Sequence, residues 1–78
     1  MMVMKDSHFR HLVGKRIKHY RELLRLSQQD LADLAALNRS YIGGVERGER
    51  NLGIDNLHKI ATGLGIETWK LLKEDETD

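Results

Sequence analysis

The chain has 78 residues, enough for one small domain, and it contains no cysteine, which excludes a disulfide framework and a thiolate zinc site. Its net charge of +1 conceals an asymmetry, because residues 1–50 carry ten Lys and Arg against six Asp and Glu, whereas residues 51–78 carry three against six. A basic first half indicates a polyanionic partner such as nucleic acid. No apolar run approaches the roughly 18 residues of a membrane span, so we expect a cytoplasmic protein without membrane contact.

Apolar residues recur at helical spacing, and no stretch alternates with the period of two that a strand requires. The first predicted helix covers residues 8–25, after a flexible N-terminus of residues 1–7. Its apolar stripe consists of Phe9, Val13, Ile17, Tyr20 and Leu24. Lys15 and Arg16 are expected on its solvated side.

A second helix is predicted over residues 28–35, because the preceding SQQD has the pattern of a capping box. In that arrangement the Ser27 hydroxyl accepts a hydrogen bond from the Asp30 amide, and the Asp30 carboxylate accepts one from the Ser27 amide. Its buried side would consist of Leu31, Ala32, Leu34 and Ala35.

Asn38 suits the N-cap of a third helix, which is predicted over residues 39–47 with Ile42 and Val45 buried. Gly43 and Gly44 stand side by side inside it, at a cost of roughly 2 kcal/mol relative to alanine. Two explanations remain open. Either the helix ends at Ile42, or something approaches its surface so closely that side chains are excluded.

A fourth helix is predicted over residues 54–64 and a short fifth over residues 68–73. The fourth would bury Ile54, Leu57, Ile60, Ala61 and Leu64, and the fifth carries Trp69 and Leu72. Residues 74–78 are too polar to pack and are expected to form a flexible acidic tail. The sequence therefore predicts an all-α, five-helix domain over residues 8–73.

The segment LSQQDLADLAALNRSYIGGVERGERN, residues 26–51, resembles the lambda-repressor/Cro-type (Xre) helix-turn-helix family. The shared features are leucine-serine-glutamine, the Leu-Ala pair, the polar cap and the Glu-Arg-Gly sequence, and the resemblance spans about residues 12–72. The Arg-Ser-Tyr-Ile run looks most similar to controller proteins of restriction–modification systems. The chain departs from the family at Ala36, where glycine is usual in the turn. A left-handed conformation would cost alanine about 1 kcal/mol or more.

The resemblance implies that the third helix is a recognition helix in the major groove of double-stranded DNA. The residues then expected to read bases are Arg39, Ser40, Tyr41 and Gly44, the last by close approach of the backbone. Those expected to contact phosphates are Gln28, Asn38, Arg47 and Arg50. Arg39 could instead contact phosphate alone, and Tyr41 could instead pack against the second helix.

Two structural roles are also implied by the resemblance. Arg21 and Glu46 are expected to form a partly buried ion pair that fixes the third helix against the first. Ile66, Trp69 and Leu72 are expected at a two-fold dimer interface, which would place two recognition helices about 34 Å apart on one face of DNA. In the alternative arrangement, Trp69 and Leu72 simply close the core of the monomer.

We therefore expect a homodimeric, sequence-specific transcription regulator that binds a near-palindromic operator, needs no cofactor or metal, and controls its own level. It would exclude or recruit RNA polymerase. An enzyme is the first rival, and its best support is the set of histidines His8, His11, His19 and His58. They lack the companion residues of a familiar metal or acid–base site. The second rival is a protein-interaction module that keeps the fold without reading DNA, and an antitoxin that represses its own operon is a third.

Overall fold

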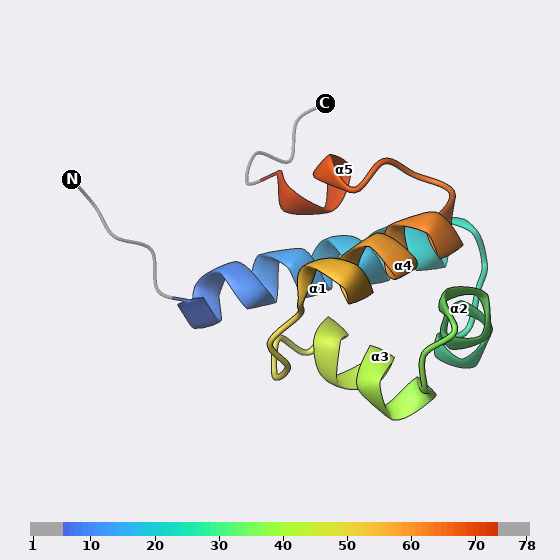
Figure 1. Cartoon of the computed structure of the whole chain (residues 1–78), viewed down its shortest axis with the longest axis horizontal. Coiled ribbons are helices and arrows are strands. Elements are labelled where there is room, and N and C mark those ends of the chain that lie inside the picture. Colours follow the sequence, from blue (N-terminus) through green and yellow to red (C-terminus); the bar gives the residue numbers. More distant parts are fainter. Residues whose placement is uncertain (1–5, 74–78) are drawn as a thin grey trace.

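A computed structural model describes residues 6–73, and within that range the chain forms five helices and no strand (Figure 1). They are α1 (Asp6–Leu23), α2 (Gln28–Ala35), α3 (Arg39–Glu46), α4 (Ile54–Leu64) and α5 (Trp69–Leu72). The predicted all-α, five-helix fold is confirmed, and the bounds of α2 and α4 agree with the prediction. The remaining helices differ by one or two residues at one or both ends, and α1 begins at Asp6, inside the segment 1–7 that was expected to be flexible. Residues 1–5 and 74–78, which belong to the two expected flexible ends, lie outside the described residues.

α1 ends at Leu23 instead of residue 25 because the chain turns into a left-handed conformation at Arg25, where φ is 58°. The Leu26 amide then donates to the Arg21 carbonyl at 3.0 Å, and the Arg25 amide donates to Glu22 at 3.0 Å. These two bonds form a Schellman motif, which closes a helix by satisfying its last carbonyls. Leu24 leaves the helical stripe as a result and is exposed.

The same closure ends α2 at Ala36, where φ is 57°, in the turn that leads to α3. The Leu37 amide donates to the Ala32 carbonyl at 2.9 Å. The turn that the family builds with glycine is therefore made here with alanine, in the left-handed conformation. That conformation costs an L-residue with a side chain about 1–2 kcal/mol.

The core receives a fully buried side chain from each of the five helices. These side chains are Ile17, Leu31, Ile42, Ile60 and Leu71. α1 packs against α3, α4 and α5, while α2 packs against α3 and α4, so the helix pair α2–α3 is held on a platform of α1 and α4 (Figure 1). The orientation of α3 is thus set by the core.

Three residues expected on buried faces are exposed instead. Leu24 follows the end of α1, Leu34 lies at the edge of the buried Leu31–Ala32–Ala35 face, and Ile54 opens α4 where no helix covers it. Leu71 was not foreseen in the core, although it is completely buried and supplies the contact that closes α5 onto the domain.

Gly14 marks the closest approach between α1 and α3. A Cβ atom at this position would lie 2.6 Å from the Glu46 carbonyl oxygen and also against that of Val45. Both atoms belong to the α3 backbone and cannot move aside without displacing the helix. Only glycine lets the two helices approach this closely.

Candidate nucleic-acid interface

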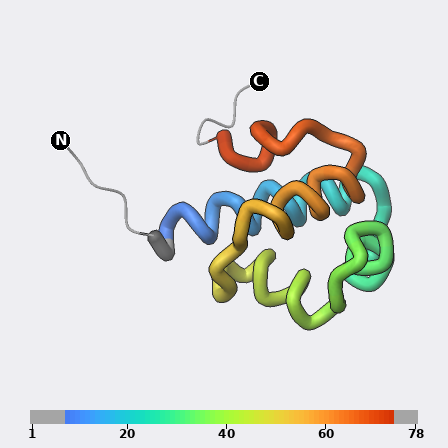
Figure 2. The backbone as a smooth tube through the Cα atoms, viewed as in Figure 1, coloured from blue at the N-terminus to red at the C-terminus, as the bar shows by residue number. Residues whose placement is uncertain are grey.

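α2 and α3 form two short helices joined by a tight turn, and each begins with a side-chain cap. The Asp30 amide donates to the Ser27 hydroxyl and the Ser27 amide donates to the Asp30 carboxylate, both at 2.9 Å. At α3 the Tyr41 amide donates to Asn38 Oδ1 at 2.8 Å. The predicted capping box and the predicted N-cap are therefore both present. The backbone trace shows α2 along its axis while α3 lies across the view (Figure 2).

α3 continues through Gly43 and Gly44, so the alternative in which the helix ends at Ile42 is wrong. Neither glycine is open to solvent. A Cβ at Gly43 would lie 3.2 Å from Arg47 Nη1 and 3.5 Å from Gln28 Oε1. A Cβ at Gly44 would lie 2.8 Å from Cγ of Arg50. The surface of α3 at Gly44, where close approach of the backbone to DNA was expected, is therefore covered by a side chain of the protein itself.

A buried ion pair joins α3 to α1, at the two positions where one was expected. Arg21 Nε donates to Glu46 Oε2 at 2.6 Å and Arg21 Nη2 donates to Glu46 Oε1 at 3.0 Å. Only 10% of the Arg21 side chain and 3% of the Glu46 side chain are exposed. The hydrogen bonds that Arg21 donates to Glu46 raise the pKa of Arg21 above its already high ordinary value, in spite of the opposing effect of burial.

The same pair is linked to both ends of the helix-turn-helix. Arg21 Nη1 donates to the Leu26 carbonyl at 2.7 Å, and Gln28 Nε2 donates to Glu46 Oε1 at 3.0 Å. Gln28, at the N-terminus of α2, is thus oriented by the carboxylate at the C-terminus of α3. The bidentate, charge-assisted contact between Arg21 and Glu46 fixes the relative orientation of the two side chains as well as their separation.

The outer side of α3 exposes cationic and polar side chains. Arg39, Ser40 and Arg47 are all exposed, and Arg50 follows in the loop after the helix. Arg47 Nε donates to Glu49 Oε1 at 3.0 Å, but both side chains are about 60% exposed. A pair this exposed contributes about 0–1 kcal/mol, so Arg47 can exchange it for another anion at little cost.

Tyr41 is half-buried at the edge of this surface. Its hydroxyl accepts a hydrogen bond from Asn56 Nδ2 of α4 at 3.2 Å. The guanidinium carbon of Arg50 lies 5.5 Å from the centre of its ring, within the range of a cation–π contact. Tyr41 therefore connects α3 with α4 and with Arg50, a combination that neither expected role described.

Several residues take positions that the sequence did not indicate. Arg16, expected to be solvated, donates from Nε to the Lys70 carbonyl at 2.9 Å and so ties α1 to α5. His11 lies against Gly48, where an added Cβ would collide with its ring. The available signal for Gly14 was an isolated glycine inside a helical pattern, which often marks a close contact.

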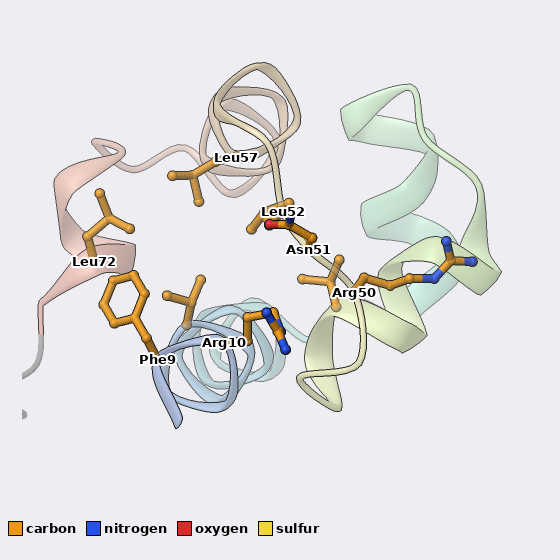
Figure 3. A pocket seen from close by; sticks show the side chains of 9 residues that line it. Phe9, Arg10, Arg50, Asn51, Leu52, Leu57 and Leu72 are labelled. Atoms are coloured by element: carbon orange, nitrogen blue, oxygen red, sulfur yellow. The ribbon is translucent and has the colours of Figure 1, made fainter. Parts of the chain in front are cut away.

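A pocket of about 360 Å³ opens between α1, α5 and the loop after α3 (Figure 3). Its apolar walls include Phe9, Leu52, Leu57 and Leu72. Arg10 lies at its rim, and Arg10 Nε is buried without a hydrogen-bond partner among the described residues. Within residues 6–73 no group of three or more His, Asp or Glu side chains is placed to hold a metal ion.

The residues expected at a dimer interface lie away from α3, at the C-terminal end of the described chain. Trp69 is 52% exposed and Leu72 is 39% exposed, while Ile66 is half-buried against the core. Among the described helices, none is long and apolar enough to cross a membrane.

Comparison with known proteins identifies the family to which this chain belongs. A family model described as helix-turn-helix (HTH_3) matches residues 17–68, which include α2, the turn and α3. The chain belongs to the helix-turn-helix family. As the resemblance indicated, it is a member of the Xre-type group, whose named relatives are transcriptional regulators and control proteins.

Individual members of this helix-turn-helix family are similar over most of the chain. The control protein C.SmaI of Serratia marcescens is 39% identical over 61 residues, which cover 78% of this chain and 73% of that protein. The crystal structure of the restriction–modification controller protein C.AhdI from Aeromonas hydrophila has a TM-score of 0.78 and 47% identity, covering 80% of this chain and 94% of that one.

A second structural relative is the N-terminal DNA-binding domain of SinR from Bacillus subtilis. Its TM-score is 0.79 at 34% identity, and the match covers 86% of this chain and 99% of that domain. Relatives of known structure are thus similar over 80% or more of this chain and not over the helix-turn-helix alone.

Proposed function

We propose that this protein is a sequence-specific DNA-binding transcription regulator that acts as a homodimer on a near-palindromic operator. In this proposal α3 enters the major groove, with Arg39, Ser40 and Tyr41 directed at base edges. Gln28, Asn38 and Arg47 contact phosphates on either side and set the register of the domain on the duplex.

The observation that carries the proposal is the distribution of acidic and basic side chains between the inner and outer sides of α3. Glu46 is the single acidic residue of the helix, and it is turned inward to Arg21. The exposed side is left with Arg39 and Arg47, joined by Arg50 from the following loop. A cationic, exposed helix surface on a rigid support is what phosphate attraction and base contact both require.

The homodimer is supported by the two sides of α5. Leu71 is completely buried and packs into the monomer core, whereas Trp69 is 52% exposed and Leu72 is 39% exposed. Their exposed apolar surface is available for a second copy. A dimer would double the phosphate contacts and read two half-sites about one helical turn apart.

The proposed mode of control is simple. The protein would act in the cytoplasm, occlude or recruit RNA polymerase at its operator, and regulate its own promoter through its concentration. No chemical reaction, cofactor or metal is part of the proposal. The similarity to control proteins of restriction–modification systems supports a place in such a system.

Selection from a pool of random duplex DNA near physiological salt tests the proposal. We expect enrichment of an inverted repeat whose half-site centres lie about 10 base pairs apart. Weak, salt-sensitive binding without an enriched sequence would contradict it and favour a protein-interaction module.

Sedimentation of the free protein tests the dimer separately. We expect the wild type to sediment as a dimer and Trp69→Ala as a monomer that still folds, as shown by its helical circular dichroism. Leu34→Ala, which removes an exposed apolar side chain on α2, is the matched control and should remain dimeric. A wild type that stays monomeric at high concentration would contradict the proposed interface.

A further inference from the structure

We propose that the pocket between α1, α5 and the loop after α3 binds a small amphipathic carboxylate. The apolar part of this ligand packs on Phe9, Leu57 and Leu72, and its carboxylate accepts hydrogen bonds from Arg10. The inference goes beyond the proposed function, which assigns no ligand to the pocket. It concerns the side of the domain where α1 meets α5, not the exposed side of α3.

The pocket has the size and the lining of a small-molecule site. Its volume of about 360 Å³ lies near the lower end of the range of about 300–1,000 Å³ that is usual for such sites. Its apolar walls consist of Phe9, Val13, Leu52, Leu57 and Leu72. Val13 and Leu57 also belong to the buried core, so this part of the wall is formed before any ligand arrives. Covering such walls with an apolar ligand is favourable, because it removes apolar surface from water.

Arg10 supplies a polar group that the fold leaves unsatisfied. Its Nε is buried, yet it has no hydrogen-bond partner among the described residues. The other two arginines of α1 do have one, since Arg16 Nε donates to the Lys70 carbonyl and Arg21 Nε donates to Glu46. A buried donor without an acceptor destabilises a protein and is rare in native structures. An oxygen atom of a ligand in the pocket would satisfy it.

The charge of the lining indicates an anion. Nine residues of the described chain line the pocket, and none of them is Asp or Glu. The positive charge of Arg10 therefore has no counter-charge within the lining. A carboxylate matches an arginine fork in both charge and geometry, because its two oxygens can each accept a hydrogen bond.

Polar and apolar groups are also separated across the pocket. In Figure 3 Phe9 and Leu72 lie on one side, and Arg10 and Asn51 lie on the other. Asn51, which also lines the pocket, carries an amide that can donate to an oxygen of the same carboxylate. A ligand with an apolar chain at one end and a single carboxylate at the other fits this separation.

The experiment titrates the full chain with sodium octanoate, followed by isothermal titration calorimetry and by backbone amide chemical shifts. Octanoate is the probe because its alkyl chain can lie on the apolar walls while its carboxylate reaches Arg10. We expect saturable binding of one octanoate per protomer. The shift changes should be largest at Phe9, Arg10 and Leu52, and small at Ser40 on the exposed side of α3.

Two substitutions on α1 form a matched pair. Arg10→Met keeps a long apolar side chain but removes the charge and the buried donor, and it should weaken octanoate binding by about 10- to 150-fold. Lys15→Met removes an exposed cation of α1 that does not line the pocket, and it should leave octanoate binding unchanged. Thermal melts provide a second measurement. Octanoate should raise the melting temperature of wild type and of Lys15→Met, but not that of Arg10→Met.

Two further probes separate the contributions of the head group and the chain. Octylamine carries the same alkyl chain with a positive charge and should not bind, because Arg10 would repel it. Butanoate keeps the carboxylate on a shorter chain and should bind more weakly than octanoate, because it covers less of the apolar wall.

Three results would overturn the inference. The first is a wild type that shows no saturable binding of octanoate. The second is equal binding by wild type and Arg10→Met, which would mean that Arg10 does not recognise the carboxylate. The third is binding that weakens as the protein concentration rises, which would assign the pocket to a second copy of the chain. None of these measurements involves DNA, so a failure here is distinct from a failure of the proposed function.

Discussion

On its inner side α3 presents Ile42, Val45 and Glu46 to the core, whereas on its outer side it exposes Arg39 and Ser40, with Arg47 exposed at its C-cap. The inner side is held by a bidentate ion pair and by contact with the α1 backbone at Gly14. The outer side has the ion pair between Arg47 and Glu49, both of whose side chains are about 60% exposed. Position is fixed from within, which leaves the outer surface free to bind.

The largest effect is expected from Glu46→Ala on the inner side. It leaves Arg21 charged, buried and without its carboxylate, which costs about 3–5 kcal/mol of unfolding free energy. Urea unfolding followed by circular dichroism measures the loss. The matched control, Glu49→Ala, removes the exposed carboxylate beside Arg47 and should change stability by less than about 1 kcal/mol.

A double variant separates the charge from the packing. Arg21→Met combined with Glu46→Leu removes both charges together and should regain most of the stability lost by Glu46→Ala, because no buried charge is left unpaired. If the double variant is no more stable than Glu46→Ala, the loss comes from packing and the ion pair is not what fixes the helix.

Two glycine substitutions should have opposite signs. Gly14→Ala drives a methyl group into the α3 backbone and should destabilise the protein by about 1–3 kcal/mol, as overpacking does. Gly43→Ala meets only the ends of the Arg47 and Gln28 side chains and should stabilise α3 by up to about 1 kcal/mol through helix propensity. Equal changes in unfolding free energy for the two substitutions would contradict the difference drawn between the inner and outer sides of α3.

Arg39→Ala acts on the outer side and should leave stability unchanged. If Arg39 pairs with a guanine, discrimination at one position of each half-site falls by about 1–3 kcal/mol. Binding of single-substitution operators measures this. Arg47→Ala should instead lower the slope of log affinity against log salt by about 0.9, as the loss of one phosphate contact does. Arg39→Ala with wild-type selectivity would refute the assigned reader.

Ala36→Gly tests the left-handed turn between α2 and α3. Relief of the left-handed alanine should raise the unfolding free energy by about 1 kcal/mol without changing sequence preference. Thermal unfolding and operator binding measure the two quantities. A stability gain accompanied by altered preference would mean that the turn also tunes how α3 meets DNA.

The smallest effect concerns pH. Hydrogen bonds from the Ser27 amide and hydroxyl lower the pKa of Asp30 below its ordinary 3.8. The stability that Asp30 supplies is therefore present above pH ~4 and is lost as pH falls through the lower native pKa. The difference in unfolding midpoint between wild type and Asp30→Asn should be constant near neutrality and narrow below pH ~4. A difference that persists in acid would contradict this.

Most of the fold could be predicted from the sequence by rules that involve only neighbouring residues. Ser27, Asp30 and Asn38 predicted where α2 and α3 begin, because caps depend on neighbouring residues only. The end of α1 was missed because the left-handed residue is Arg25, a type that rarely marks a helix end. Leu71 was missed because α5 has a single turn, too short for periodicity to identify its buried side.

The contacts of the candidate nucleic-acid interface likewise divide into those that could be anticipated from the sequence and those that could not. Arg21 and Glu46 were anticipated through a family resemblance and not through spacing, since 25 residues separate them. The position of the Arg50 side chain over Gly44 could not be predicted, because Arg50 belongs to a loop whose path the sequence does not specify. Gly14 shows the same limit, since its neighbour is the backbone of a distant helix.

The most direct test of this account maps backbone amide chemical shifts while the enriched duplex is added to the isotope-labelled protein. We expect the largest changes at Arg39, Ser40, Gly44 and Arg47, with small changes at the buried Ile17 and Ile60. Shifts concentrated on α5, or spread evenly through the core, would contradict the claim that the outer side of a rigidly held α3 meets DNA.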